Sequence, residues 1–228
     1  MPNITLYIIL FFYALTLAIA LWRYPKYYNT ALKYYPILIA YTLASEAIGI
    51  AIRIYPDSIM LPISKFYQNY NRPIYNVFNI IFFLYFFNLY KNYTDSLALK
   101  KYIKIGSSLF IAISISNIFT QDFLTDGQIL TYVTGGFLLI LIILNYLNKI
   151  DWLQNKKDPI KNILYWLSWG LLIFYSGYLP LKLSYHFKII KTMDSYIITR
   201  WLHFSLIIIM YLCFIYGFIK MKRKLVKE

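Results

Sequence analysis

The sequence predicts an all-α integral membrane protein, a polytopic bundle of seven transmembrane helices. Of its 228 residues, 60% are apolar and 14% are charged, whereas a soluble domain is roughly half apolar and about a quarter charged. The apolar residues lie in long continuous runs, and a helix needs roughly 20 of them to cross a bilayer core about 30 Å thick. The runs do not alternate between polar and apolar residues, as the strands of a membrane barrel do.

Seven such runs follow one another along the chain, joined by short connections. They cover residues 4–22, 34–55, 73–90, 102–120, 128–148, 161–180 and 195–219. We therefore expect residues 1–228 to form a single transmembrane helical domain without a soluble domain. The first run has no basic segment before it and is followed by Arg23 and Lys26, which favours a membrane helix over a cleaved signal peptide.

Lysine and arginine between the runs predict the orientation, because these residues are enriched on the cytoplasmic side of a membrane. With the N-terminus outside, the cytoplasmic loops and the tail hold 16 of them and the outer loops hold five. The outer five are Lys65, Arg72, Lys182, Lys188 and Lys191, while Arg53 and Arg200 lie within runs. The sequence thus predicts an outside N-terminus and a cytoplasmic C-terminus.

The net charge of +14 has the same explanation. In a soluble protein this charge would favour nucleic acid as a partner, but here the cations flank apolar runs, so we expect no nucleic acid. The lipid bilayer is the expected partner. Anionic lipids should contact the inner loops, where each Lys or Arg gains about 1 kcal/mol near a negatively charged leaflet.

Residues that carry catalytic or metal chemistry are scarce. One cysteine excludes a disulfide scaffold and a cysteine-rich zinc site. Two histidines and nine acids without clustering indicate neither a metal site nor a cofactor. We therefore assign no catalytic residue from the sequence.

A few polar side chains lie inside the apolar runs, where they are costly and need a partner or a function. Glu46 belongs to the second run, and Arg200 and His203 share a face of the last. Glu46 and His203 should lie at similar depths, roughly 13 and 12 Å below the outer surface, so Glu46 is expected to pair with Arg200 or His203. A purely structural contact between helices explains Glu46 equally well.

Other polar residues concentrate in the same outer half of the predicted bundle, which suggests a polar pocket that opens outward. The candidate ligand-binding residues are Glu46, Asn76, Asn79, Asn117, Tyr175, Arg200 and His203. Two outer segments flank this region. Residues 181–189 alternate strictly between apolar and polar and predict an extended segment over the pocket, and residues 58–70 predict a short interfacial helix.

The segments YTLASEAIGI, NVFNIIFFLYFF and YWLSWGLLIFYSGYLP, together with the apolar runs, resemble a group of small bacterial seven-helix integral membrane proteins without an assigned activity. The resemblance covers most of the chain. It implies a fold class and a multi-pass location in a bacterial cytoplasmic membrane, and it adds no site residue.

Three functions fit these observations. The first is a sensory or signalling membrane module that binds a ligand in the outer pocket and acts through a cytoplasmic signalling partner. The second is a small-solute transporter, which needs a broken helix or an inverted repeat at the membrane midplane. The third is a membrane-embedded lipid-modifying enzyme that uses Glu46 and His203. We favour the first, because the polar groups gather on one side and the sequence carries no signature of a transporter or an enzyme.

Overall fold

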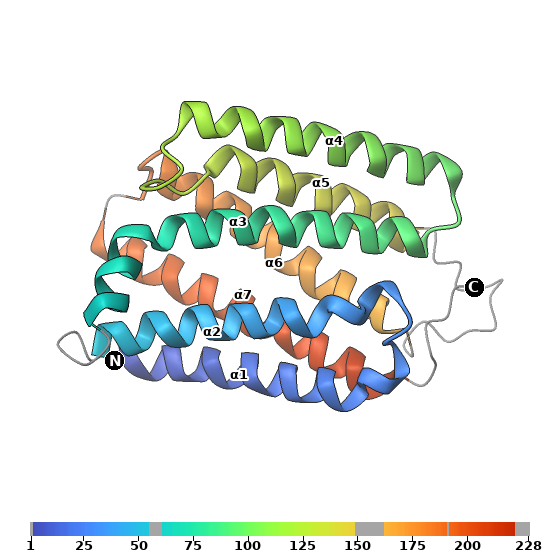
Figure 1. Cartoon of the computed structure of the whole chain (residues 1–228), viewed down its shortest axis with the longest axis horizontal. Coiled ribbons are helices and arrows are strands. Elements are labelled where there is room, and N and C mark those ends of the chain that lie inside the picture. The colour runs from blue at the N-terminus through green and yellow to red at the C-terminus, as the bar shows by residue number, and fades with distance from the viewer. Residues whose placement is uncertain (1, 55–60, 149–161, 191, 222–228) are drawn as a thin grey trace. The chain divides into compact units, whose positions relative to one another are not determined.

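The computed structural model describes residues 2–54, 61–148, 162–190 and 192–221. The regular structure of these residues is all helix, with no strand among them, which confirms the predicted all-α class (Figure 1). Each of the seven predicted runs coincides with a helix. The helices are α1 (Pro2–Arg23), α2 (Tyr35–Ile54), α3 (Leu61–Tyr93), α4 (Leu97–Thr120), α5 (Ile129–Asn148), α6 (Ile163–His186) and α7 (Met193–Lys220), with the 3-10 turns η1 (Tyr24–Lys26) and η2 (Ala31–Tyr34) after α1.

Six of the described helices are long and apolar enough to span a membrane, namely all except α6. The chain is therefore a multi-pass membrane protein. The predicted span at 161–180 does form α6, but Tyr165, Ser168 and Lys182 are among the polar residues that lower the apolar character of this helix.

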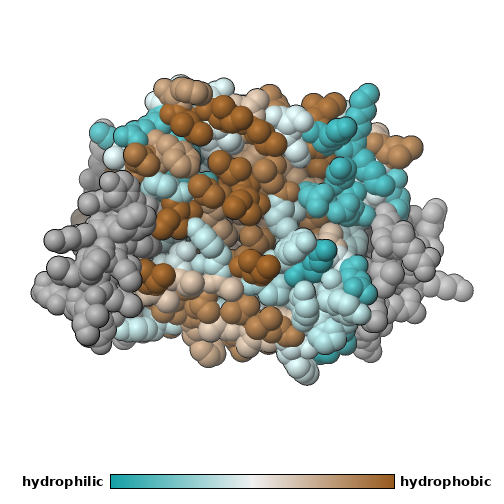
Figure 2. Space-filling view, viewed as in Figure 1, coloured by the Kyte–Doolittle hydropathy of each residue, from teal (hydrophilic) through white to brown (hydrophobic). Residues whose placement is uncertain are grey.

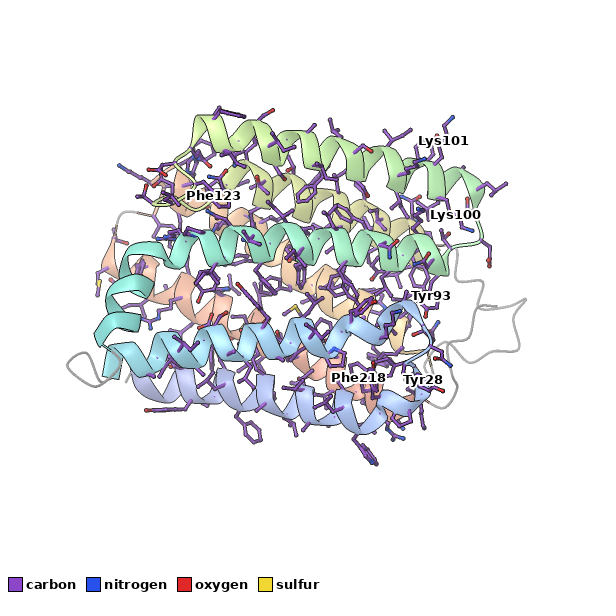
Figure 3. The ribbon with its side chains drawn as sticks, viewed as in Figure 1. Tyr28, Tyr93, Lys100, Lys101, Phe123 and Phe218 are labelled. Carbon is purple, nitrogen blue, oxygen red and sulfur yellow. The ribbon has the colours of Figure 1, made fainter. Side chains whose placement is uncertain are left out.

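The surface of these helices supports the same conclusion. Large apolar side chains point away from the protein along α4, including Leu109, Ile115 and Phe119, which is 85% exposed. Figure 2 shows apolar surface over the middle of α4 and hydrophilic surface at the end where Figure 3 labels Lys100 and Lys101. Such continuous apolar exposure is rare on soluble monomers and typical of contact with lipid.

The chain divides into two compact units. Unit 1 comprises Met1–Ala40 with Ile140–Glu228, and unit 2 comprises Tyr41–Leu139. Helices α2 and α5 each contribute to both units. The prediction of a single domain over 1–228 stays a prediction.

Unit 2 is built around the ring of Phe83 on α3. This fully buried ring packs edge-on against Phe110 of α4 and Tyr132 of α5, at centroid distances of 5.7 Å in both cases. On α5, Gly135 lies so close to Phe83 that a Cβ at this position would collide with the ring. The absence of a side chain at Gly135 therefore permits α3 and α5 to pack closely.

The beginning of α3 runs at a steep angle to the long straight part of the helix (Figure 1). Pro73 lies inside α3 and explains a bend, because proline lacks the N–H for an intrahelical bond and its ring crowds the preceding turn. The segment predicted as a short interfacial helix at 58–70 is helical from Leu61 onward and is continuous with α3. Residues 55–60 lie outside the described residues.

In unit 1, α6 and α7 pack against each other side by side in opposite directions (Figure 1). Three glycines set their register, because a Cβ on Gly170, Gly177 or Gly217 would come within 3 Å of the other helix. Gly170 faces Cys213, Gly177 faces Leu206 and Gly217 faces Trp166. The residue numbers of each facing pair add up to 383, as expected for two antiparallel helices in one fixed register.

The extended segment predicted for residues 181–189 is wrong. Helix α6 continues through Pro180 to His186, with Pro180 on an exposed face. The helix then ends in a Schellman motif, in which the N–H of Ile189 donates to the carbonyl of Ser184 and the N–H of Lys188 donates to that of Tyr185. Lys188 takes the left-handed conformation, with φ of 53°. The alternation of polar and apolar residues in 181–189 therefore belongs to a helix end whose last residues are exposed.

Helix α1 runs in the same direction as α7. Tyr13 packs against Tyr211 midway along the two helices, at a centroid distance of 4.6 Å. Near their C-terminal ends, Arg23 donates a hydrogen bond to the carbonyl of Ile219 over 3.0 Å. Figure 3 labels Tyr28 and Phe218 at this same end of unit 1.

The glycine contact between α6 and α7 generates a prediction for Gly170→Ala. A Cβ at Gly170 would lie 3.0 Å from the backbone carbonyl oxygen of Met210, and overpacking against backbone costs about 1–3 kcal/mol. The variant should therefore be destabilised despite the higher helix propensity of alanine. The measurement is the free energy of unfolding of the purified protein in mixed detergent micelles.

Gly106→Ala is the matched control for this experiment. A Cβ at Gly106 would meet only the side chain of Leu138, at an ordinary contact distance of 3.6 Å. Alanine should raise stability there by up to about 1 kcal/mol. Equal effects of the two substitutions would contradict the assigned packing of α6 on α7.

Candidate functional site

The predicted site residues fall into both units. Glu46, Asn76, Asn79 and Asn117 belong to unit 2, whereas Tyr175, Arg200 and His203 belong to unit 1. Each group is described within its own unit. The predicted pairing of Glu46 with Arg200 or His203 would join the two units and stays a prediction.

In unit 2, Asn76 fastens the loop between α4 and α5. Its amide nitrogen donates hydrogen bonds to the carbonyls of Phe123 and Asp126, over 3.0 and 2.9 Å. Its amide oxygen accepts from the backbone N–H of Gln128 over 3.1 Å. Asn76 is 3% exposed. Because both amide hydrogens are engaged, any ligand of Asn76 would have to compete with the loop.

Asn117, about one turn before the end of α4, also holds neighbouring elements together. Its amide nitrogen donates to the Thr131 hydroxyl on α5 over 3.2 Å, and its amide oxygen accepts from the Thr120 hydroxyl over 3.1 Å. Like Asn76, Asn117 is buried. The side chain thus links α4 to α5 beside the loop.

Two glutamines complete the loop. The side-chain oxygen of Gln121 accepts the backbone N–H of Ile129, and the side-chain nitrogen of Gln128 donates to the carbonyl of Gln121. These bonds satisfy backbone groups at the end of α4 and the start of α5 that no helix partner can reach. The sequence did not single out Gln121 or Gln128, because a loop glutamine carries no local signal of such a role.

The same loop contains an Asx turn at Asp122. The carboxylate accepts the backbone N–H of Leu124 over 2.8 Å. This bond, together with the Thr125 hydroxyl, lowers the pKa of Asp122 below its ordinary value, because both donors favour the charged form. The loop between α4 and α5 carries acidic groups but no lysine. At the opposite end of unit 2, the turn between α3 and α4 is surrounded by Lys91, Lys100, Lys101 and Lys104.

Glu46 and Asn79 are the remaining candidates in unit 2. Glu46 lies on α2 and Asn79 on α3, and both side chains are half-buried. Asn79 is one turn from Asn76 on the same helix but is less enclosed than its neighbour. The two asparagines, both predicted as ligand-binding residues, thus lie in different surroundings.

In unit 1, His203 of α7 stacks on Tyr178 of α6. The two rings are almost parallel, with centroids 4.2 Å apart and an angle of 19° between their planes. Phe174 also stacks on Tyr178, and its ring contacts His203 directly at a centroid distance of 6.2 Å. Tyr175 is buried next to Phe174, with 4% of its surface exposed. The structure therefore places Tyr175 and His203 in one aromatic cluster between the two helices.

Beyond this cluster, Tyr185 joins the end of α6 to the beginning of α7, where its ring contacts Tyr196. The hydroxyls of Tyr185 and Thr199 share a hydrogen bond of 2.6 Å. Tyr178, Lys182 and Tyr185 follow at helical spacing, so they share the face of α6 that meets α7. The expectation of an extended segment at 181–189 does not include this face; the helical spacing of Tyr178, Lys182 and Tyr185 across Pro180 is the signal that indicates it.

The C-terminal end of α7 is capped by cations that lie far away in the sequence. Arg23 donates to the carbonyl of Ile219 and Lys26 to that of Met221, each over 3.0 Å. The last carbonyls of a helix lack intrahelical partners and carry partial negative charge, so cations stabilise them. Two of the basic residues predicted to mark the inner side thus also hold α1 and η1 to the end of α7.

Tyr27 fixes the turn from which Lys26 reaches α7. Its hydroxyl donates to the carbonyl of Ala20 over 2.7 Å, and its ring packs on Phe218. Burial raises the pKa of the Tyr27 phenol well above its ordinary value, because the charged form would lose its hydration. Tyr27 is therefore a neutral structural residue at physiological pH.

Known proteins add no assignment to this geometry. Comparisons with protein-family models, with curated proteins and with solved structures find no match for the chain. Among the described residues, no three histidine, cysteine, aspartate or glutamate side chains gather where they could hold a metal ion.

The loop contacts of Asn76 generate a prediction for Asn76→Ala. The substitution removes three hydrogen bonds and leaves the backbone groups of the loop without partners in a buried place. Each such group costs about 1–3 kcal/mol, so the loss of stability should be about 3 kcal/mol or more in total. The measurement is again the free energy of unfolding in micelles.

Asn79→Ala is the control, because it makes the same change one turn away on a half-buried position. It should cost less than half as much as Asn76→Ala. A larger loss for Asn79→Ala would show that the loop does not depend on Asn76.

Proposed function

We propose that the protein is a sensory or signalling membrane module. A ligand is received at the end of unit 1 where α6 ends and α7 begins, and the signal leaves at the other end of α7 through a cytoplasmic partner. The observation that carries this proposal is the position of α7. It is one unbroken helix that bears Arg200 and His203 near its beginning and the carbonyls held by Arg23 and Lys26 at its end.

The contacts of α7 support its role as the transmitting element. At its beginning, it is joined to α6 by the His203–Tyr178 stack and the Tyr185–Thr199 hydrogen bond. Along its length, the glycine contacts leave little room for sliding. A ligand that favours one position of the first turns of α7 therefore also shifts the position of the last turn of α7. At that last turn, the contacts of Arg23 and Lys26 can be kept or lost.

This proposal includes a seventh span and an orientation. Helix α6 has 24 residues and is thus about 36 Å long, enough to cross a bilayer core. Helices α1 and α7 are parallel, and two parallel spans must be separated by an odd number of others. If α2 to α5 each cross, α6 must cross as well. The inner basic residues then place the ends of α1 and α7 in the cytoplasm of a bacterial cell.

The proposal is tested by photo-crosslinking from the tail. A photo-reactive amino acid replaces Leu225 in cells of the source organism, and crosslinked proteins are identified by mass spectrometry. We expect one cytoplasmic protein whose crosslinking yield changes at least about threefold in Arg200→Gln and in His203→Gln, since a coupling of about 0.6 kcal/mol or more already shifts populations that far.

Ser205→Ala is the matched control, because Ser205 lies two residues from His203 at an exposed position of α7. It should leave the yield unchanged. The proposal fails if no cytoplasmic protein crosslinks, or if the yield is the same in all variants. Two other results would replace the proposal. If Glu46 affects uptake of a solute into proteoliposomes but not crosslinking, the protein is a transporter. If Glu46 affects the lipid composition but not crosslinking, the protein is an enzyme.

A further inference from the structure

The end of unit 1 that holds the beginning of α7 is unusually basic for its proposed side of the membrane. Its described residues include Lys182, His186, Lys188 and Arg200, against a single acid, Asp194. Lysine and arginine are normally depleted outside the cytoplasm. The connection between α4 and α5 in unit 2, by contrast, contains Asp122 and Asp126 and no lysine or arginine. A local excess of cations against this rule indicates attraction of an anion.

The register of α6 and α7 brings three of these groups together. In that register, Arg200 lies at the level of Leu183 and His203 at the level of Pro180. Lys182 therefore lies between Arg200 and His203 in height. The face that carries the cluster is held by the Tyr185–Thr199 hydrogen bond on one side and the Tyr178 stack on the other.

Arg200 and His203 keep their polar groups available. Within the described residues, the imidazole of His203 makes ring contacts but no hydrogen bond, and the exposed guanidinium of Arg200 makes neither a hydrogen bond nor an ion pair. The two residues are one turn apart on α7, which separates their Cβ atoms by about 5–6 Å. That spacing lets both side chains reach one small ligand group.

We propose that Arg200 and His203 bind an oxyanion, a carboxylate or phosphate group, with Lys182 supplying additional positive charge. The proposal rests on the proposed function and names the ligand class of its receiving end. A guanidinium presents two parallel N–H donors that match two oxygens of such a group. A histidine N–H one turn away supplies a third donor. The oxyanion belongs to a lipid headgroup or to a dissolved ligand, since exposed Tyr196 and Trp201 beside Arg200 are typical of the membrane interface.

The test measures anion binding by the purified full-length protein in an uncharged detergent. Inorganic phosphate and acetate are titrated by calorimetry, first in detergent alone and then with phosphatidylglycerol added. We expect saturable binding that Arg200→Gln and His203→Ala each weaken by about tenfold or more, since hydrogen bonds to charged groups contribute most of the affinity. Arg72→Gln, which removes an exposed arginine from unit 2, is the matched control and should bind like the wild type.

The two sources of the oxyanion give different results. If phosphatidylglycerol abolishes phosphate binding in the wild type, the ligand is a lipid headgroup; if it has no effect, the ligand is a dissolved anion. Either result supports the site. The proposal is overturned if neither the anions nor the lipid bind saturably, or if Arg72→Gln weakens binding as much as Arg200→Gln.

Unfolding of each variant without anion shows whether it is folded, so a folding defect is not mistaken for a binding defect. No cytoplasmic partner takes part in this experiment. A failure here therefore removes the ligand class while leaving the crosslinking result intact, and a failure of crosslinking leaves the binding result intact.

Discussion

The close antiparallel contact between α6 and α7 is the constraint on which the candidate site depends. Three glycines allow the helices to approach so closely that a methyl group at any of them would collide with the other helix. Close approach of this kind is a general source of stability in membranes, where the hydrophobic effect does not drive one helix onto another. Because the glycines fix the register, they also fix which side chains meet at the far end. The stack of His203 on Tyr178 and the position of Lys182 between His203 and Arg200 follow from that register.

Polar side chains within the membrane helices have two distinct uses in this protein. Asn76 and Asn117 are buried and satisfied, and they hold the connection between α4 and α5 to the helices that flank it. Arg23 and Lys26 likewise satisfy the last carbonyls of α7. In lipid, unsatisfied backbone groups are costly, so such residues stabilise the fold without binding anything else. Arg200 and His203 differ, because in the described chain no hydrogen bond engages them. This difference, more than their depth, makes them the stronger candidates for a ligand.

The sequence predicted the seven helices and their approximate positions, since a continuous apolar run and a polar connection are local features, but α3 begins at Leu61, well before the predicted run at 73–90. The sequence did not predict that α6 continues through Pro180, because the alternation in 181–189 imitates a strand and proline usually ends a helix. The roles of Asn76 and Lys26 depend on partners about 50 and 195 residues away in the chain, and no local pattern contains that information. For the same reason the pairing of Glu46, which depends on tertiary structure, remains a prediction from spacing alone.

The register of α6 on α7 is tested most directly by disulfide formation between cysteines introduced into the two helices. In a background where Cys213 is replaced by serine, Gly177→Cys is combined with Leu206→Cys or, as a control, with Met210→Cys. A disulfide requires Cβ atoms about 3.5–4.5 Å apart, and four residues along a helix correspond to about 6 Å. The account predicts rapid oxidation of the 177–206 pair and none of the 177–210 pair. Faster oxidation of the 177–210 pair would contradict the register and, with it, the assembly of Lys182, Arg200 and His203 into one site.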